Sequence, residues 1–116
     1  MLGKTLYFVA PRQVEVREEQ VVAPAADEVL VQSELSAISA GTEMLLYRGQ
    51  MPNVANSTAD EVSRGLAYPT PYGYSVVGRV VSAGPSVKPG WEGKRVFAFR
   101  PHSSFFAARP ETLLEV

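Results

Sequence analysis

The stretch Ser39-Ala40-Gly41-Thr42-Glu43 breaks a long apolar segment with a tight turn and starts a short helix. Thr42 is placed to cap this helix, Glu43 suits the positive end of the helix dipole, and Gly49 ends the helix. A second stretch, Gly73-Tyr74-Ser75-Val76-Val77-Gly78, also joins a turn to polar groups and an apolar run. A glycine inside a β-branched strand, such as Gly78, marks a bulge or the close approach of another backbone. These two stretches carry the interpretation of fold and function.

The rest of the chain predicts a mainly β domain. Short apolar or alternating segments are separated by Gly/Pro turns, which is typical of a partly open barrel or a sandwich with one or two short helices. The segment 13–18 alternates with period two and is predicted to be half-buried, whereas 28–38 is predicted to bend midway where its alternation shifts. The predicted strands cover 5–10, 13–18 (a hairpin through 11–12), 28–38, 76–83, 95–99 and 104–108. Residues 110–112 predict a helix start or a turn before 113–116, and a second short helix is predicted over 57–65 in a surface excursion.

Length and composition set the broad class. The 116 residues fit one domain, and 46% apolar with 20% charged residues is ordinary globular composition. The net charge of -1 attracts no polyanion, so neither nucleic acid nor a membrane is an expected partner. The chain has no cysteine and one histidine, His102, which excludes disulfides, thiolate ligands and a multi-histidine metal site within it. The apolar segment near the N-terminus, residues 6–10, is too short for a signal peptide, so a soluble, cytoplasmic protein is expected.

Three pieces of the chain occur in an order and spacing that match a known family. The first is residues 37–43 followed by Gly49, the second is residues 73–84, and the third is Val87, Gly90 and residues 93–96. They resemble, in turn, a cysteine-glycine-threonine-aspartate turn, a glycine-histidine-glutamate strand and a glycine-aspartate-arginine-valine strand start. Together they are similar to the N-terminal, GroES-like catalytic domain of the medium-chain dehydrogenase/reductase family, and the likeness covers nearly all of residues 1–116.

The departures from the family pattern concern its metal. Ala40 stands where zinc members have a cysteine ligand, Tyr74 stands at the histidine ligand, and Ser75 at the neighbouring glutamate. A catalytic zinc needs three protein ligands, and the resemblance leaves at most one, so no zinc is expected. The four-cysteine loop of the structural zinc is also missing from the sequence. Within the family, the amino-acid sequence is most similar to a zinc-free bacterial branch that includes bacteriochlorophyllide-type hydroxyethyl dehydrogenases.

The resemblance also implies a second domain. Family members place a Rossmann domain after this one, with a glycine-rich turn that holds the cofactor pyrophosphate. The sequence contains no Gly-x-Gly-x-x-Gly turn, since Gly90-Trp91-Glu92-Gly93 does not fit it. We therefore expect a domain fragment that meets NAD(P)H through the missing Rossmann domain and binds little dinucleotide alone. Without that domain, the chain is expected to expose an apolar patch and to form homo-oligomers.

The candidate catalytic residues are Thr42, Tyr74 and His102. Hydride transfer to a carbonyl builds negative charge on oxygen, and without zinc this charge needs hydrogen-bond donors. Thr42 matches the family's proton-relaying hydroxyl and is either a donor to the substrate oxygen or a helix N-cap. Tyr74 is either a general acid in the cleft or a partly buried aromatic residue. His102 is either a proton carrier or a structural histidine of a loop.

The other polar residues near these motifs have simpler interpretations. Glu43 matches the family's acid, but stabilisation of the helix dipole together with backbone hydrogen bonding at the helix start is the favoured explanation. Ser75 fills the vacated ligand position, and Arg48 is interpreted as a solvated charge. Trp91 is interpreted as a lid over one end of the barrel, or as an interface contact.

Two functions compete at this stage. The first is the catalytic domain of a zinc-independent, NAD(P)-dependent alcohol dehydrogenase or reductase acting on a small carbonyl, alcohol or enone. The alternative is a stand-alone GroES-like binding or assembly module without catalysis, since fold does not fix function. A zinc enzyme with unusual ligands is disfavoured by Ala40.

Overall fold

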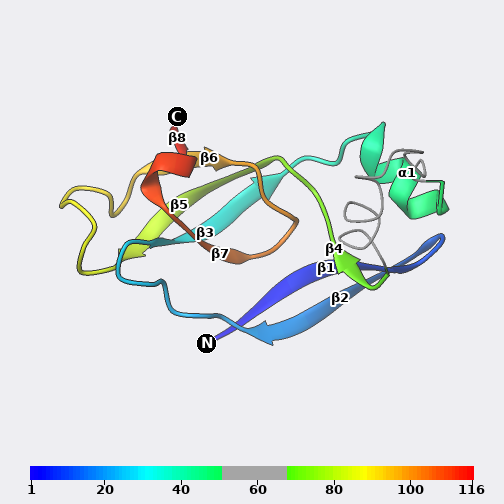
Figure 1. Cartoon of the computed structure of the whole chain (residues 1–116), viewed down its shortest axis with the longest axis horizontal. Coiled ribbons are helices and arrows are strands. Elements are labelled where there is room, and N and C mark those ends of the chain that lie inside the picture. Colours follow the sequence, from blue (N-terminus) through cyan, green and yellow to red (C-terminus); the bar gives the residue numbers. More distant parts are fainter. Residues whose placement is uncertain (51–67) are drawn as a thin grey trace, which may run out of the picture.

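A computed structural model describes residues 1–50 and 68–116, which form two antiparallel sheets (Figure 1). The first sheet has the order β2-β1-β4 and the second the order β7-β3-β5-β6-β8. The predicted mainly β architecture is confirmed, although the barrel is not closed. The strands are β1 (Leu2–Ala10), β2 (Gln13–Gln20), β3 (Val29–Ser36), β4 (Thr70–Pro71), β5 (Val76–Ala83), β6 (Arg95–Ala98), β7 (Phe105–Ala108) and β8 (Leu114–Glu115), with one helix α1 (Thr42–Arg48) and one 3₁₀ turn (Pro110–Thr112). The helix predicted over 57–65 lies outside the described residues.

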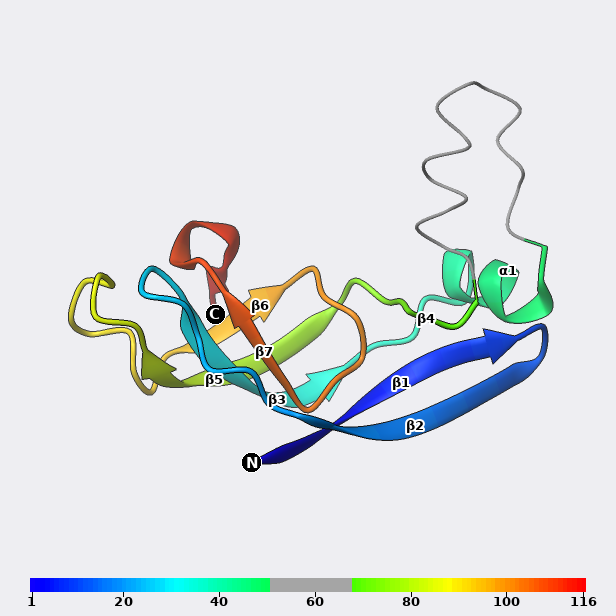
Figure 2. The same ribbon diagram turned by 60° about the horizontal axis from the view of Figure 1, so that its bottom comes forward.

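The β1–β2 hairpin forms as predicted, but its second strand is not half-buried. Arg12 turns the chain with a φ of 60°, and β2 pairs only with β1 at the edge of its sheet. Val14 and Val16, the apolar side of the alternation, are 49% and 61% exposed. Period-two alternation shows that a strand has two different faces, but it does not show that a second layer covers either one. Figure 2 shows β2 running along the outside of the molecule.

The five-stranded sheet holds the core. Its buried face is lined by β-branched side chains such as Val31, Val80 and Val96, and Trp91 packs against this cluster as a lid would. The predicted bend in β3 is confirmed, because the pairing of β3 with β5 shifts register between Ser33 and Leu35. These side chains fit a sheet because their branching suits a pleated, packed surface.

The opposite face of this sheet carries an exposed apolar row. Leu35 pairs with Val77, Val77 with Phe97, and Phe97 with Leu114, so the row crosses four strands. Leu35 is 71% exposed and Leu114 is 57% exposed. The exposed apolar patch expected from the sequence is therefore present on this face.

The two sheets are joined where β1 meets the segment before β7. The Leu6 N–H donates to the carbonyl of His102 at 3.0 Å, and Thr5 forms an isolated bridge with Ser103. The Lys4 N–H donates to Ser104 Oγ at 2.8 Å. These bonds turn the pair of sheets into a partly open barrel and fix His102 beside the end that carries α1. Within residues 1–50 and 68–116, no helix is long and apolar enough to cross a membrane.

Candidate functional site

Helix α1 begins at the turn that the sequence singles out. Gly49 ends the helix with a φ of 71°, as predicted, and its N–H bonds back to Leu46 at 3.1 Å. The start differs by one residue from the prediction: Gly41 is the N-cap, and no side chain caps the helix. Thr42 is the first helical residue and half-buried, so its interpretation as an N-cap is wrong. Within residues 1–50 and 68–116, the Thr42 hydroxyl makes no capping hydrogen bond.

Glu43 is the buried centre of the site. Its side chain is only 2% exposed, although it lies in the first turn of a short helix. One carboxylate oxygen accepts the N–H of Ser39 at 2.6 Å, and the other contacts His102 Nε2. A carboxylate that served only the helix dipole would gain as much at the surface, without losing its hydration. The favoured sequence interpretation of Glu43 included backbone bonding at the helix start, which the Ser39 N–H bond confirms, but it did not include the contact with His102.

His102 is buried and held at both ring nitrogens. Nε2 faces Glu43, and Nδ1 lies 2.6 Å from Ser36 Oγ, the hydroxyl at the end of β3. Both ring nitrogens therefore have a polar partner, a carboxylate oxygen on one side and a hydroxyl on the other. The structure thus brings together residues 36, 43 and 102 from three separate segments.

Tyr74 lies in the segment between β4 and β5 and contacts the turn that carries Ala40 and Thr42. Its hydroxyl donates to Ser39 Oγ at 2.6 Å, while its side chain remains 38% exposed. The ring of Tyr72 meets it edge to face, with centroids 6.4 Å apart. The phenol is therefore anchored at one end and accessible from solvent, as a donor to a substrate oxygen must be.

The pKa of Tyr72 depends on its burial and on the neighbouring groups of this cluster. Burial raises the pKa of Tyr72 first, and the nearby Tyr74 and Glu43 raise it further. Replacing Glu43 with glutamine removes one of these negative charges, so we expect the pKa of Tyr72 to fall but to stay above its ordinary value. Carbon-13 NMR titration of the tyrosine Cζ signals, assigned with Tyr72→Phe, measures this change. An unchanged Tyr72 titration in Glu43→Gln, as expected for the exposed control Glu92→Gln, would contradict the placement of the carboxylate.

Arg48 and Ser75 lie near the cluster but make no side-chain hydrogen bond with it among the described residues. Arg48 is exposed, which fits its interpretation as a solvated charge, and Ser75 is half-buried with its carbonyl accepting the Ala37 N–H at 3.0 Å. Among the described residues, no three histidine, aspartate, glutamate or cysteine side chains gather closely enough to hold a metal ion. Sequence reasoning assigned no role to Ser36, Ser39 or Tyr72, although Ser39 begins the first motif and Tyr72 directly precedes the second.

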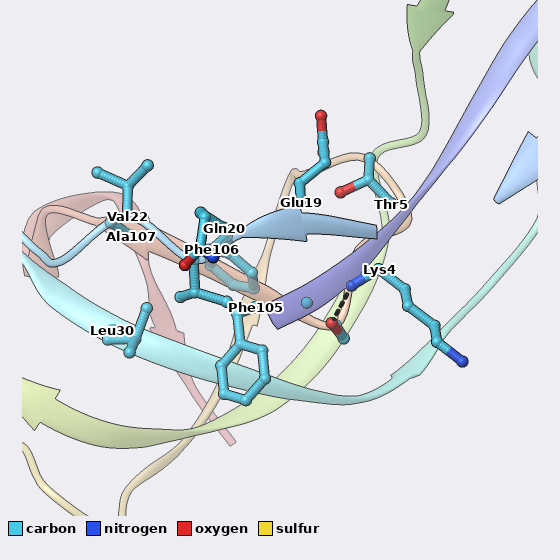
Figure 3. A pocket seen from close by; sticks show the side chains of 12 residues that line it. Lys4, Thr5, Glu19, Gln20, Val22, Leu30, Phe105, Phe106 and Ala107 are labelled. Atoms are coloured by element: carbon cyan, nitrogen blue, oxygen red, sulfur yellow. Dashed lines mark hydrogen bonds between the residues drawn. The ribbon is translucent and has the colours of Figure 1, made fainter. Parts of the chain in front are cut away.

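A cavity of about 210 Å³ lies between the hairpin and the second sheet (Figure 3). Lys4, Glu19, Leu30 and Phe105 are among the side chains that line it. None of Thr42, Tyr74 and His102 is part of its lining. The polar cluster is therefore a separate feature, formed on the α1 end of the molecule.

No family model matches the chain. The sequence is 38% identical, over 98 residues and 84% of its length, to the 2-desacetyl-2-hydroxyethyl bacteriochlorophyllide A dehydrogenase of Cereibacter sphaeroides. The structure matches the quinone oxidoreductase of Coxiella burnetii with a TM-score of 0.73 at 15% identity, over 99% of this chain and 37% of that one. It also matches an alcohol dehydrogenase superfamily protein of Novosphingobium aromaticivorans with a TM-score of 0.75 at 21% identity, over 99% and 34% of the two chains. Over nearly its whole length, the chain is similar to proteins of the medium-chain dehydrogenase/reductase family.

These matches confirm the family resemblance drawn from the three motifs, including the likeness to hydroxyethyl bacteriochlorophyllide dehydrogenases. The chain spans 27% of the length of that relative. A further structural match of the medium-chain dehydrogenase/reductase fold is the Escherichia coli quinone oxidoreductase complexed with NADPH, with a TM-score of 0.67 at 18% identity, over 97% of this chain and 33% of that one.

Proposed function

We propose that the chain is the substrate-side, GroES-like domain of a zinc-independent, NAD(P)-dependent oxidoreductase. The reaction would be hydride transfer between nicotinamide and a carbonyl, alcohol or enone. The observation that carries this proposal is the bond from the Tyr74 hydroxyl to Ser39 Oγ at 2.6 Å. It supports a phenol lying at the turn where Ala40 replaces the family's metal-binding cysteine.

The proposed chemistry relies on hydroxyl groups. Nicotinamide, when bound, supplies the hydride, and the carbonyl oxygen gains negative charge as its carbon accepts it. Tyr74 would donate its proton to that oxygen, and Thr42, whose hydroxyl caps no helix, would donate a second hydrogen bond. When the phenol turns to the substrate, the freely rotating Ser39 hydroxyl can reverse its role and donate to the phenol oxygen.

The cofactor and partners follow from the family. NAD(P)H would be held by a Rossmann domain outside residues 1–116, and the structural match to the Escherichia coli quinone oxidoreductase complexed with NADPH supports that choice. A cytoplasmic location, a small-molecule substrate and a homo-oligomer formed over the apolar row remain part of the proposal. Neither nucleic acid nor a membrane is a proposed partner.

Kinetics of the complete protein test the proposal. The coding sequence beyond Val116 should contain a glycine-rich βαβ unit, and the purified product should oxidise NADH or NADPH with members of a panel of ketones, enones and quinones. Tyr74→Phe is expected to lower kcat about 100-fold, because one donor to the developing oxyanion is lost. Tyr7→Phe, on β1, is the matched control and should leave kcat unchanged.

Two results would count against the proposal. Stoichiometric zinc in the active protein would show that the ligand assignment at positions 40 and 74 is wrong. A coding sequence that stops at Val116, with a product that neither binds nor oxidises NAD(P)H, would favour the stand-alone binding module.

A further inference from the structure

Glu43 and His102 form a buried pair that is not part of the hydrophobic core. Both side chains are nearly inaccessible, at 2% and 8% exposed, and 59 residues separate them in sequence. Burying an ionisable pair removes its hydration, and an apolar pair of similar volume often stabilises a fold as well or better. The hydrophobic core lies elsewhere, in the five-stranded sheet. The role of the pair therefore lies in the neighbouring groups that it holds in place.

The first contact leads to the phenol through Ser39. The Ser39 N–H donates to Glu43 Oε2 at 2.6 Å, and Ser39 Oγ accepts the Tyr74 hydroxyl, also at 2.6 Å. Ser39 thus links the two residues, because the Glu43 carboxylate fixes its backbone and its own hydroxyl fixes the Tyr74 phenol. Tyr74 is 38% exposed, so this bond restrains a ring that solvent would otherwise leave free to move.

The second contact leads to the backbone that carries the same phenol. Gly73 has a φ of 142°, and a Cβ there would lie 2.9 Å from Cδ2 and Nε2 of His102. The imidazole therefore packs directly against the residue before Tyr74, at a place where only glycine leaves room. Ser36 holds the other ring nitrogen at 2.6 Å and so fixes the plane of the ring.

We propose that Glu43 and His102 are positioning residues that set the direction of the Tyr74 hydroxyl from two sides, through Ser39 and through Gly73. This inference rests on the proposed role of Tyr74 as proton donor and deepens it. Neither residue touches the substrate. Their effect on the reaction is to hold the donor in the geometry in which its proton reaches the developing oxyanion, since small losses of alignment cost catalysis heavily.

A double-mutant cycle in the complete protein tests the coupling. Glu43→Gln is expected to lower kcat about 10-fold with little change in KM, because the donor is misaligned while the binding surface persists. In a Tyr74→Phe background, the same change should alter kcat less than about 2-fold, because no donor is left to misalign. Ser39→Ala, which keeps the backbone bond to the carboxylate, should repeat the kcat loss and serves if Glu43→Gln does not fold. The exposed Glu92→Gln is the matched control and should leave kcat unchanged.

NMR provides a readout that does not depend on catalysis. In Glu43→Gln, the Ser39 amide proton should move upfield and the Tyr74 Cζ signal should move with it. A Tyr74 signal that stays in place in both Glu43→Gln and Ser39→Ala would overturn the inference, as would a 10-fold loss of kcat that is the same with and without the phenol. Full activity in Tyr74→Phe would instead overturn the proposed proton donor, and the NMR result would still decide whether Glu43 holds the phenol.

Discussion

Replacing Gly78 with alanine is expected to destabilise the chain by about 3 kcal/mol or more, a large share of the stability of a small domain. A Cβ at this position would lie 2.4 Å from the carbonyl oxygen of Gln32 and 2.7 Å from Val31 Cγ1. The first of these atoms is backbone in the neighbouring strand β3, so it cannot move aside as a flexible side chain would. The strands β3 and β5 would have to separate at the centre of the sheet, where Val31 and Val80 form the core.

Urea unfolding followed by circular dichroism measures this loss as a shift of the midpoint. Gly41→Ala is the matched control, because the nearest atom to a Cβ there is Ser39 Oγ at 4.0 Å. Its cost should stay within about 1 kcal/mol, which is the usual difference between helix N-cap residues. Equal midpoints for the two variants would show that β3 and β5 do not approach as closely at Gly78 as described.

Gly78 also shows what the sequence could predict. A lone glycine in a β-branched run has few explanations, so close approach of another backbone could be inferred from the pattern alone. The bend of β3 could be inferred in the same way from a shift in its alternation. Both features are local, because they depend on neighbouring residues of one strand. The exposure of β2 could not be inferred, because it depends on whether another layer covers the strand.

The site shows the same division between local and distant contacts. The placement of Tyr74 at the turn was expected, because the resemblance puts both motifs at one metal position. The pairing of Glu43 with His102 had no such signal. It arises because β1 pairs with the segment before β7 and carries His102 to the helix end, and no spacing in the sequence shows this. A lone histidine and a helix-start glutamate each have a common structural explanation, and only their contact distinguishes this case.

Replacing Glu43 with alanine is expected to destabilise the chain by about 3 kcal/mol. The truncation would leave the Ser39 N–H and the Nε2 atom of His102 without their partner in a buried site, and removing one member of a buried pair is costlier than removing both. It would also open a cavity beneath the first turn of α1. The side chain of Glu43→Gln still fills the site and accepts the Ser39 N–H in a weaker bond than the carboxylate does, so that variant should lose much less.

Thr42→Ala provides the comparison within the same helical turn. Thr42 is half-buried, and its side chain caps no helix end. Because alanine also favours helix, the free energy of unfolding of Thr42→Ala should stay within about 0.5 kcal/mol of that of the unmodified chain. Urea unfolding of the three variants should therefore give the order Thr42→Ala, Glu43→Gln, Glu43→Ala from most to least stable. If Glu43→Ala proved as stable as Thr42→Ala, the carboxylate would be acting only on the helix dipole, and the buried contact with His102 would contribute nothing to the fold.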